Sequence, residues 1–221
     1  MKELRFEHST VDPAPPGIRN DICVVGDIDG DGIEDFVIGG YEGTDNVVWY
    51  RAPRWERFTI GEGNLEAGGL LVDITGDGAF DLVAGQPLSG TGLYWWERPA
   101  DPTARWTRRV ITDRFAKYHD QAAGDIDGDG KTEIVFLSQK SEVLCYADIP
   151  AYPRVEPWPE ECIHVIFEGE NIEGLSVADI DGDGKNEIVA GGSVFRLVDG
   201  KWRREKFSDY VKPVACVADL T

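Results

Sequence analysis

The stretch Asp27-Ile28-Asp29-Gly30-Asp31-Gly32-Ile33-Glu34-Asp35 decides the fold, because its pattern of acidic residues returns three more times along the chain. The other copies begin at Asp73, Asp125 and Asp179. In every copy, side chains that carry oxygen stand at positions 1, 3, 5 and 9, and glycine stands at positions 4 and 6. Glycine lets the backbone turn sharply, through positive φ where needed, so the carboxylates can converge on one point.

A ring of oxygen ligands around one point suits calcium, a hard cation that takes six to eight oxygens at about 2.3–2.6 Å. The backbone carbonyl of position 7 can supply a further oxygen. The sequence therefore predicts up to four structural Ca²⁺ ions. The expected ligands, loop by loop, are Asp27, Asp29, Asp31, Ile33 and Asp35; Asp73, Thr75, Asp77, Ala79 and Asp81; Asp125, Asp127, Asp129, Lys131 and Glu133; and Asp179, Asp181, Asp183, Lys185 and Glu187. The second loop is the weakest, because Thr75 replaces an aspartate.

These loops differ from an EF-hand, which needs glutamate at position 12 and a helix on either side. Position 12 here is Ile38, Ala84, Phe136 or Ala190, and each closes a short apolar run that is typical of a strand. The loop therefore joins two strands. Four copies in one chain favour a calcium loop over an acidic turn that holds no metal.

The composition limits the classes of partner. The chain has 221 residues, 42% of them hydrophobic, and a formal net charge of −19, which argues against nucleic acid or an anionic membrane surface. No apolar run is long enough for a membrane span, and Met1-Lys2-Glu3-Leu4-Arg5 leads into no signal-peptide core. As written, the sequence indicates a cytoplasmic protein; the calcium loops favour the alternative, an extracellular or periplasmic one.

The loops mark repeats of about 50 residues, a period that indicates a stacked or radial array. Each unit reads as an apolar strand, the loop, a second strand, an aromatic strand and a fourth strand, which is one propeller blade. The sequence predicts an all-β fold, a β-propeller of four-stranded antiparallel blades, as a single domain over residues 1–221. The four complete blades are expected near residues 21–60, 67–111, 119–167 and 173–207.

These repeats resemble the FG-GAP and VCBS repeats of calcium-binding β-propellers, and the resemblance covers nearly the whole chain. It implies calcium between the first and second strands of a blade and a ring of about seven blades. Residues 6–11 match the fourth-strand pattern and are expected to form an outer closing strand. Because Asp219-Leu220-Thr221 begins a fifth loop motif, we expect the sequence to be truncated at its C-terminus.

The connection before the third blade is the longest, and it concentrates reactive side chains. His119 is the candidate general acid or base, Tyr118 a proton donor, and Arg114 or Lys117 a clamp for a substrate carboxylate or enolate. The run Tyr118-His119-Asp120-Gln121 before a loop also resembles the propeller domains of aldos-2-ulose dehydratase and of some polysaccharide lyases. Two alternatives stay open: a transition-metal site that pairs His119 with Glu173 or Asp21, and a histidine that only caps the loop by hydrogen bonding.

Two functions follow from these observations. The first is a calcium-stabilised module that binds carbohydrate or protein, and the alternative is a sugar dehydratase or polysaccharide lyase with its site at the propeller mouth around His119. Trp49, Trp95 and Trp96 could stack on sugars, but their places on blade strands favour a role in the core between blades. The identity of the ligand is not encoded in these motifs, since function lies in the site and not in the fold.

Overall fold

The computed structural model describes residues 7–212 and 217, and it consists of four four-stranded antiparallel sheets. In each sheet the strands pair in chain order, which confirms the predicted all-β fold and the four-stranded units. The strands are β1 (Ile22–Gly26), β2 (Asp35–Gly39), β3 (Val47–Arg51) and β4 (Glu56–Gly61); β5 (Leu70–Val72), β6 (Asp81–Gly85), β7 (Leu93–Glu97) and β8 (Thr107–Thr112); β9 (Tyr118–Gly124), β10 (Glu133–Ser138), β11 (Val143–Asp148) and β12 (Ile163–Glu168); and β13 (Leu175–Ala178), β14 (Glu187–Ala190), β15 (Ser193–Val198) and β16 (Lys201–Lys206).

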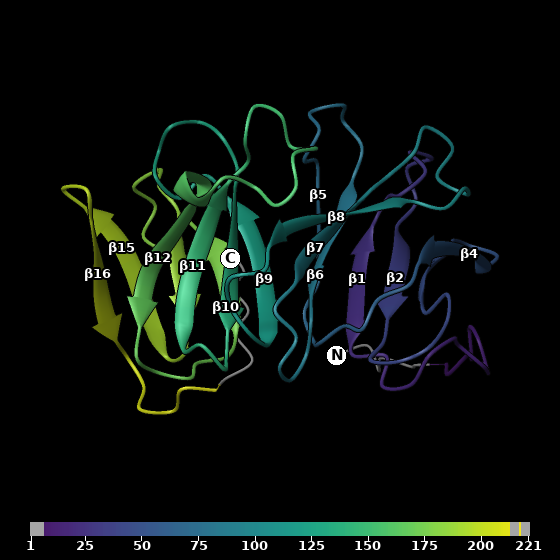
Figure 1. The fold of residues 1–221 in the computed structure, drawn as a ribbon, viewed down its shortest axis with the longest axis horizontal. Coiled ribbons are helices and arrows are strands. Elements are labelled where there is room, and N and C mark those ends of the chain that lie inside the picture. Colours follow the sequence, from purple (N-terminus) through teal and green to yellow (C-terminus); the bar gives the residue numbers. More distant parts are fainter. Residues whose placement is uncertain (1–6, 213–216, 218–221) are drawn as a thin grey trace, which may run out of the picture.

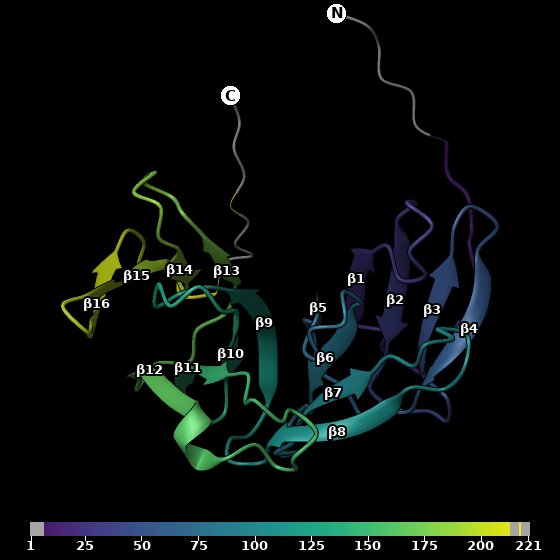
Figure 2. The same cartoon turned by 90° about the horizontal axis from the view of Figure 1, so that it is seen from above.

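The four sheets stand side by side in an arc (Figure 1), and the view from above shows the first strand of each sheet on the inner side (Figure 2). Neighbouring inner strands contact one another, β1 with β5, β5 with β9, and β9 with β13. A parallel bridge between Ile22 and Gly68 and a hydrogen bond from the Gly69 N–H to Gln121 Oε1 (2.7 Å) tie these inner strands together. This is a propeller-like arrangement, and the arc stays open between the first and the fourth sheet (Figure 2).

The core lies between neighbouring sheets. One cluster joins Trp49 of the first sheet to Leu82 and Trp96 of the second, and another joins Trp95 of the second to Phe136 of the third. All three tryptophans are at most 1% exposed, so they are core residues, as their strand positions predicted, and do not offer stacking surfaces for a sugar. Each large ring removes apolar surface from water on the faces of two sheets at once, which holds the sheets together.

One expectation about the ends of the units needs correction. Residues 7–11 form no strand, although a closing strand was expected over residues 6–11; Phe6 lies outside the described residues. None of the four sheets pairs with this segment, and Asp12 beyond it accepts hydrogen bonds from the Tyr50 hydroxyl (2.8 Å) and from Arg57 (2.7 Å) of the first sheet. In the third sheet, a 3-10 turn (Glu160–Cys162) precedes β12, so the fourth strand begins at Ile163.

The fifth loop motif, at residues 219–221, lies outside the described residues. Over the described part of the chain, no helix has the length and apolar character needed to cross a membrane.

Candidate functional site

The four acidic loops lie along one edge of the array, where the first strand of each sheet ends and the second begins (Figure 1). In the first loop, the Asp27 carboxylate accepts hydrogen bonds from the N–H groups of Gly30 (2.8 Å) and Gly32 (2.9 Å). Asp73, Asp125 and Asp179 make the same pair of bonds in the other loops. The glycines take φ near +80°, a conformation that side-chain residues rarely adopt, so the repeated glycines allow each loop to wrap around its first carboxylate.

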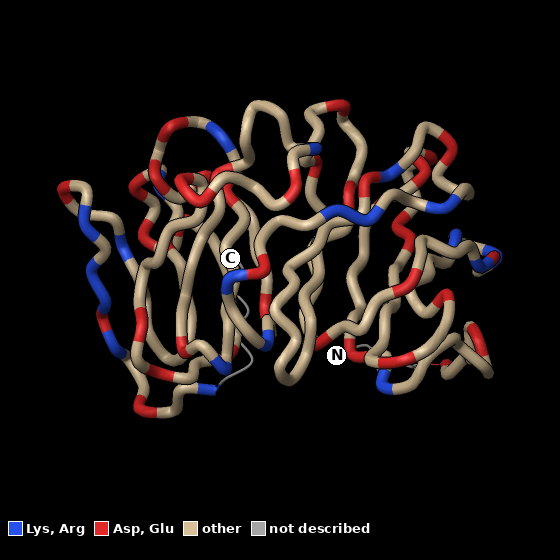
Figure 3. Tube along the Cα trace, viewed as in Figure 1, with Lys and Arg blue, Asp and Glu red and all other residues tan. Residues whose placement is uncertain are grey.

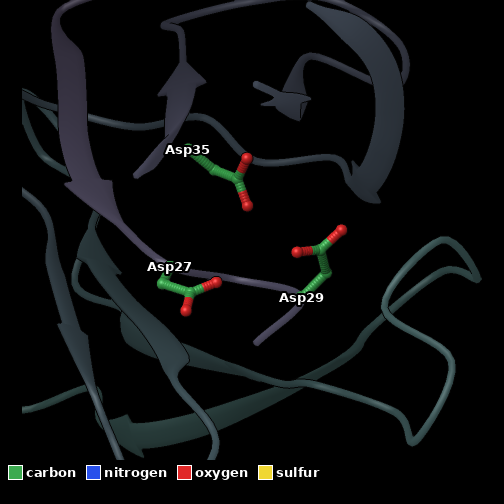
Figure 4. Close-up of side chains that lie close together, drawn as sticks. All are labelled: Asp27, Asp29 and Asp35. Carbon is green, nitrogen blue, oxygen red and sulfur yellow. The ribbon is translucent and has the colours of Figure 1, made fainter. Parts of the chain in front are cut away.

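Three of the loops bring together the carboxylates of positions 1, 3 and 9, with one oxygen from each within 4.8 Å of the others. Figure 4 shows the first of these groups, in which three carboxylates point toward one another. The groups are Asp27, Asp29 and Asp35; Asp125, Asp127 and Glu133; and Asp179, Asp181 and Glu187. The position-9 carboxylates are buried, and in the first loop the Asp29 Oδ1 atom is also buried and has no hydrogen-bond partner.

This geometry fits a calcium ion. Three carboxylates at such short separations repel one another, and an unpaired buried carboxylate oxygen is costly unless a cation or a donor meets it. The donor set is all oxygen, which suits calcium rather than zinc or copper. The side chains of positions 1, 3 and 9 would hold the ion in these loops.

Asp35, Asp81 and Glu133, which stand at position 9 of their loops, have raised pKa values, and burial is the main cause. Burial raises the pKa of Glu133 to about 7, with the neighbouring loop aspartates adding to the shift and the hydrogen bond from the Ile126 N–H opposing it. Burial likewise raises the pKa of Asp81 to about 6, and it raises the pKa of Asp35. The first carboxylate of the fourth loop differs, because hydrogen bonds from the loop backbone, that of the Gly184 N–H foremost, lower the pKa of Asp179.

Some expected ligands are not gathered. The position-5 carboxylates of Asp31, Asp77, Asp129 and Asp183 each accept the N–H of position 7, that is of Ile33, Ala79, Lys131 and Lys185, and none of them joins a carboxylate group in the described residues. The second loop forms no such group within the described part of the chain. Its third position, Thr75, offers a hydroxyl in place of a carboxylate, as the sequence indicated.

The third strand of each sheet brings one more charged residue beside the loop, a feature that the sequence analysis missed. Arg51 Nε lies 2.8 Å from Asp29 Oδ2 in the first sheet, and Arg196 Nε lies 3.5 Å from Asp181 Oδ2 in the fourth. The other two sheets carry Glu97 and Asp148 at the corresponding strand position. In each sheet this charged residue directly follows the residue that pairs with position 10 of the loop repeat. The sequence alone does not give that pairing, so the charged residue could be assigned to the loop only once the strand register was known.

At the opposite edge, His119 lies near the start of β9 with its side chain 22% exposed. Its Nδ1 atom lies 2.9 Å from Asp120 Oδ2, which also accepts the Gly174 N–H (2.9 Å) from the fourth sheet. Burial alone would lower the pKa of His119, but the hydrogen bond and charge of Asp120, helped by the charges of Glu173 and Glu66, raise it above its ordinary value. His119 is therefore a partly accessible acid or base, and Asp120 also links two sheets.

The other candidate catalytic residues have contacts of their own. Tyr118 is 0% exposed and its hydroxyl accepts the Phe115 N–H (3.1 Å), and burial raises the pKa of the phenol. Arg114 lies over the Phe115 ring at 5.0 Å. Lys117 lines a separate pocket with Leu88. In the described residues His119 forms a pair with Asp120 and no hydrogen bond or ion pair with Tyr118, Arg114 or Lys117, so the joint site of these four residues stays a prediction.

Comparison with known proteins agrees with the repeat pattern. A family model for the FG-GAP-like repeat matches residues 27–84 and again residues 73–136. Aldos-2-ulose dehydratase of Phanerodontia chrysosporium is 29% identical over 147 residues, which cover 57% of this chain and only 15% of that enzyme. The chain thus corresponds to a small part of the curated relative that it matches.

Two solved structures share the fold. One is an Agrocybe aegerita lectin, described by its specific recognition of non-reducing terminal N-acetylglucosamine, with a TM-score of 0.55, 15% identity, and coverage of 85% of this chain and 52% of that one. The other is the V. cholerae biofilm matrix protein Bap1, with a TM-score of 0.51, 17% identity, and coverage of 89% of this chain and 32% of that one. At such identities the likeness speaks for the fold alone. Together with the four loops and four sheets, the family match shows that the chain is an FG-GAP-type repeat domain.

Proposed function

We propose that this chain is a calcium-stabilised β-propeller module that binds carbohydrate or protein. The observation that carries the calcium part is the convergence of three carboxylates in each of three loops, including the buried and unpartnered Asp29 Oδ1. Calcium bound to the folded loops relieves this repulsion, and a ligand that binds only the folded state stabilises it. The first strands of all four sheets lie on the inner side of the arc (Figure 2), which supports the proposal that the arc is part of a propeller ring.

The binding part of the proposal has two supports. The fold is shared with a lectin that recognises a terminal sugar and with a biofilm matrix protein. The edge opposite the calcium loops is built from connections between sheets, and such loops on a rigid scaffold commonly carry binding residues. The net charge of −19 disfavours nucleic acid as the partner.

The test combines two measurements on the same protein. Thermal melting with excess chelator and with millimolar calcium measures the structural role of the ion, and a glycan and protein binding screen in calcium measures the function. We expect melting to rise with calcium and at least one class of glycan or protein to bind. An unchanged melting temperature after full removal of metal would contradict the calcium part.

A second candidate function rests on the His119–Asp120 pair. A half-buried histidine whose pKa is raised by a carboxylate can transfer protons near neutral pH, as a sugar dehydratase or polysaccharide lyase requires. Aldos-2-ulose dehydratase, which this chain matches in sequence, is named for this kind of chemistry. The test is a screen of the protein on anhydro sugars and uronic-acid polysaccharides for the ultraviolet absorbance of unsaturated products.

A further inference from the structure

A pocket of about 420 Å³ lies at the edge opposite the calcium loops. It is lined by Leu88, Ser89, Lys117, Gln139, Lys140 and Asn171. These residues come from the β6–β7 turn, the β8–β9 connection, the β10–β11 turn and the β12–β13 connection, so three neighbouring sheets contribute to it. Figure 3 shows basic residues on this edge near the start of β9, although the molecule as a whole is dominated by acidic ones.

The charge of the pocket is unusual for this protein. Lys117 and Lys140 both line it, and within the described residues neither ammonium group has an ion-pair partner, in a chain with 41 acidic and 22 basic residues. Lys212, which contacts the pocket residue Asn171, is paired instead: its Nζ is bound to Glu173 Oε1 (2.6 Å) and to Asn171 Oδ1 (3.2 Å). Two unpaired cations that line one open pocket favour an anionic ligand, because the ligand removes their mutual repulsion.

Lys117 is also held in place by its backbone. Its φ is +62°, a region that favours glycine, and the conformation is fixed by hydrogen bonds from the Lys117 N–H to the Gly90 carbonyl (3.1 Å) and from the Gln139 N–H to the Lys117 carbonyl (2.8 Å). A non-glycine residue at such a φ is uncommon and is often associated with function. The two bonds also join Lys117 to the turns that carry the rest of the pocket.

Gln139 supplies an acceptor that the protein leaves unused. The residue is only 2% exposed, its amide nitrogen donates to Glu173 Oε1, and its Oε1 atom is buried without a hydrogen-bond partner. The amide orientation is fixed, since the reverse orientation would place the carbonyl oxygen against the Glu173 carboxylate. A buried unpaired carbonyl is costly, and a hydroxyl from a ligand would satisfy it.

We propose that this pocket binds a sugar acid, with the carboxylate held between Lys117 and Lys140 and a ring hydroxyl donated to Gln139 Oε1. Leu88, 55% exposed at φ +52°, offers an apolar contact for the C–H face of the ring, and Ser89 offers a hydroxyl. The volume suits one or two sugar units. The inference rests on the proposed binding function and specifies its ligand class. An acidic peptide would satisfy the lysines, but it brings no hydroxyl-rich ring for the Gln139 and Leu88 side of the pocket.

The experiment is a calorimetric titration of the calcium-loaded protein with galacturonate oligosaccharide and, separately, with a neutral galactose oligosaccharide of the same length. We expect the acidic sugar to bind and the neutral one to bind at least about tenfold more weakly, because the neutral sugar lacks the carboxylate that makes the charge-assisted contacts. Lys117→Gln and Lys140→Gln should each weaken the acidic sugar about tenfold and leave calcium-dependent melting unchanged. Lys201→Gln, an exposed lysine on β16, is the matched control and should change nothing.

Four outcomes would overturn the proposal. Equal binding of the two sugars would show that the pocket does not recognise the carboxylate, and so would an equal loss of affinity in Lys201→Gln. The proposed carbohydrate-binding function would stand in both cases. Tighter binding of a polyglutamate peptide than of the sugar acid would identify an acidic-peptide site instead. No binding of any sugar or protein in the wider screen, with calcium-dependent melting intact, would remove the binding function itself.

Discussion

Arg51 Nε lies 2.8 Å from Asp29 Oδ2, so a side-chain cation from β3 already lies beside the first acidic loop. Asp29 stands at position 3 and its other oxygen is buried without a partner. The guanidinium therefore offsets part of the carboxylate repulsion in the ion-free loop, and it opposes a calcium ion placed at the same carboxylates. Arg196 stands in the same relation to Asp181, at 3.5 Å, whereas the second and third sheets have Glu97 and Asp148 there.

Arg51→Gln should strengthen calcium binding at the first loop by about tenfold, because a like charge near the ion is removed. The same change should lower the melting temperature of the chelator-treated protein. Calcium titration calorimetry and melting measure the two effects. Arg54→Gln, an exposed arginine in the adjoining turn with no ion pair in the described residues, is the control. Weaker calcium binding in Arg51→Gln would show that the arginine supports the bound ion.

The third loop should matter more than the second. Asp127→Ala removes one carboxylate of a group that the structure brings together, whereas Thr75→Ala alters a loop that forms no such group in the described part. In saturating calcium we expect Asp127→Ala to lose about 1–3 kcal/mol of stability and Thr75→Ala less than about 1 kcal/mol. Equal shifts in melting temperature for the two variants would contradict this ranking.

The ion-free protein should become less stable as the pH rises. The pKa of Glu133 is about 7 in the folded protein against an ordinary value of 4.5, so the folded state binds the proton more tightly than the unfolded state. Stability from this group is therefore complete below about pH 4.5 and is lost as the pH rises toward 7, and Asp81, with a pKa of about 6, acts in the same direction. Melting in chelator at about pH 5 and about pH 8 measures the loss. Glu133→Gln should reduce this loss of stability. Saturating calcium should reduce it too, because the ion offsets the carboxylate charge as the proton does.

If the protein eliminates water or cleaves sugars, His119→Ala should lower turnover by roughly 10²–10⁴, the usual contribution of a positioned acid or base. Asp120→Asn should also lower it, because the carboxylate raises the pKa of His119. Asp120 additionally accepts the Gly174 N–H, so melting curves must accompany the assay of that variant. Full activity in His119→Ala would place the chemistry elsewhere.

The sequence alone predicted those parts of the fold that follow from a repeated local pattern. Four copies of one loop with apolar runs on both sides predicted the four sheets, and the strand positions of Trp49, Trp95 and Trp96 predicted their burial. Contacts between distant segments could not be read in the same way. The burial of Tyr118 depends on Phe115 and Phe136 closing around it, and the approach of Arg51 to Asp29 depends on strand register.

The pocket at the opposite edge escaped sequence analysis for a related reason. Leu88, Lys117, Lys140 and Asn171 stand on four separate connections, and no motif joins them. Of these residues, the sequence singled out only Lys117, as a clamp for a substrate carboxylate or enolate near His119. The folded connections instead place Lys117 beside the second and third sheet turns.

The most direct test is a calcium titration of the chelator-stripped protein by calorimetry, with the number of bound ions as the result. We expect three ions per chain at the three carboxylate groups, with weaker binding or none at the second loop. Asp35→Asn, Glu133→Gln and Glu187→Gln should each remove or weaken one of the three. No calcium binding, or binding that is unchanged in all three variants, would contradict the assignment of these loops as calcium sites.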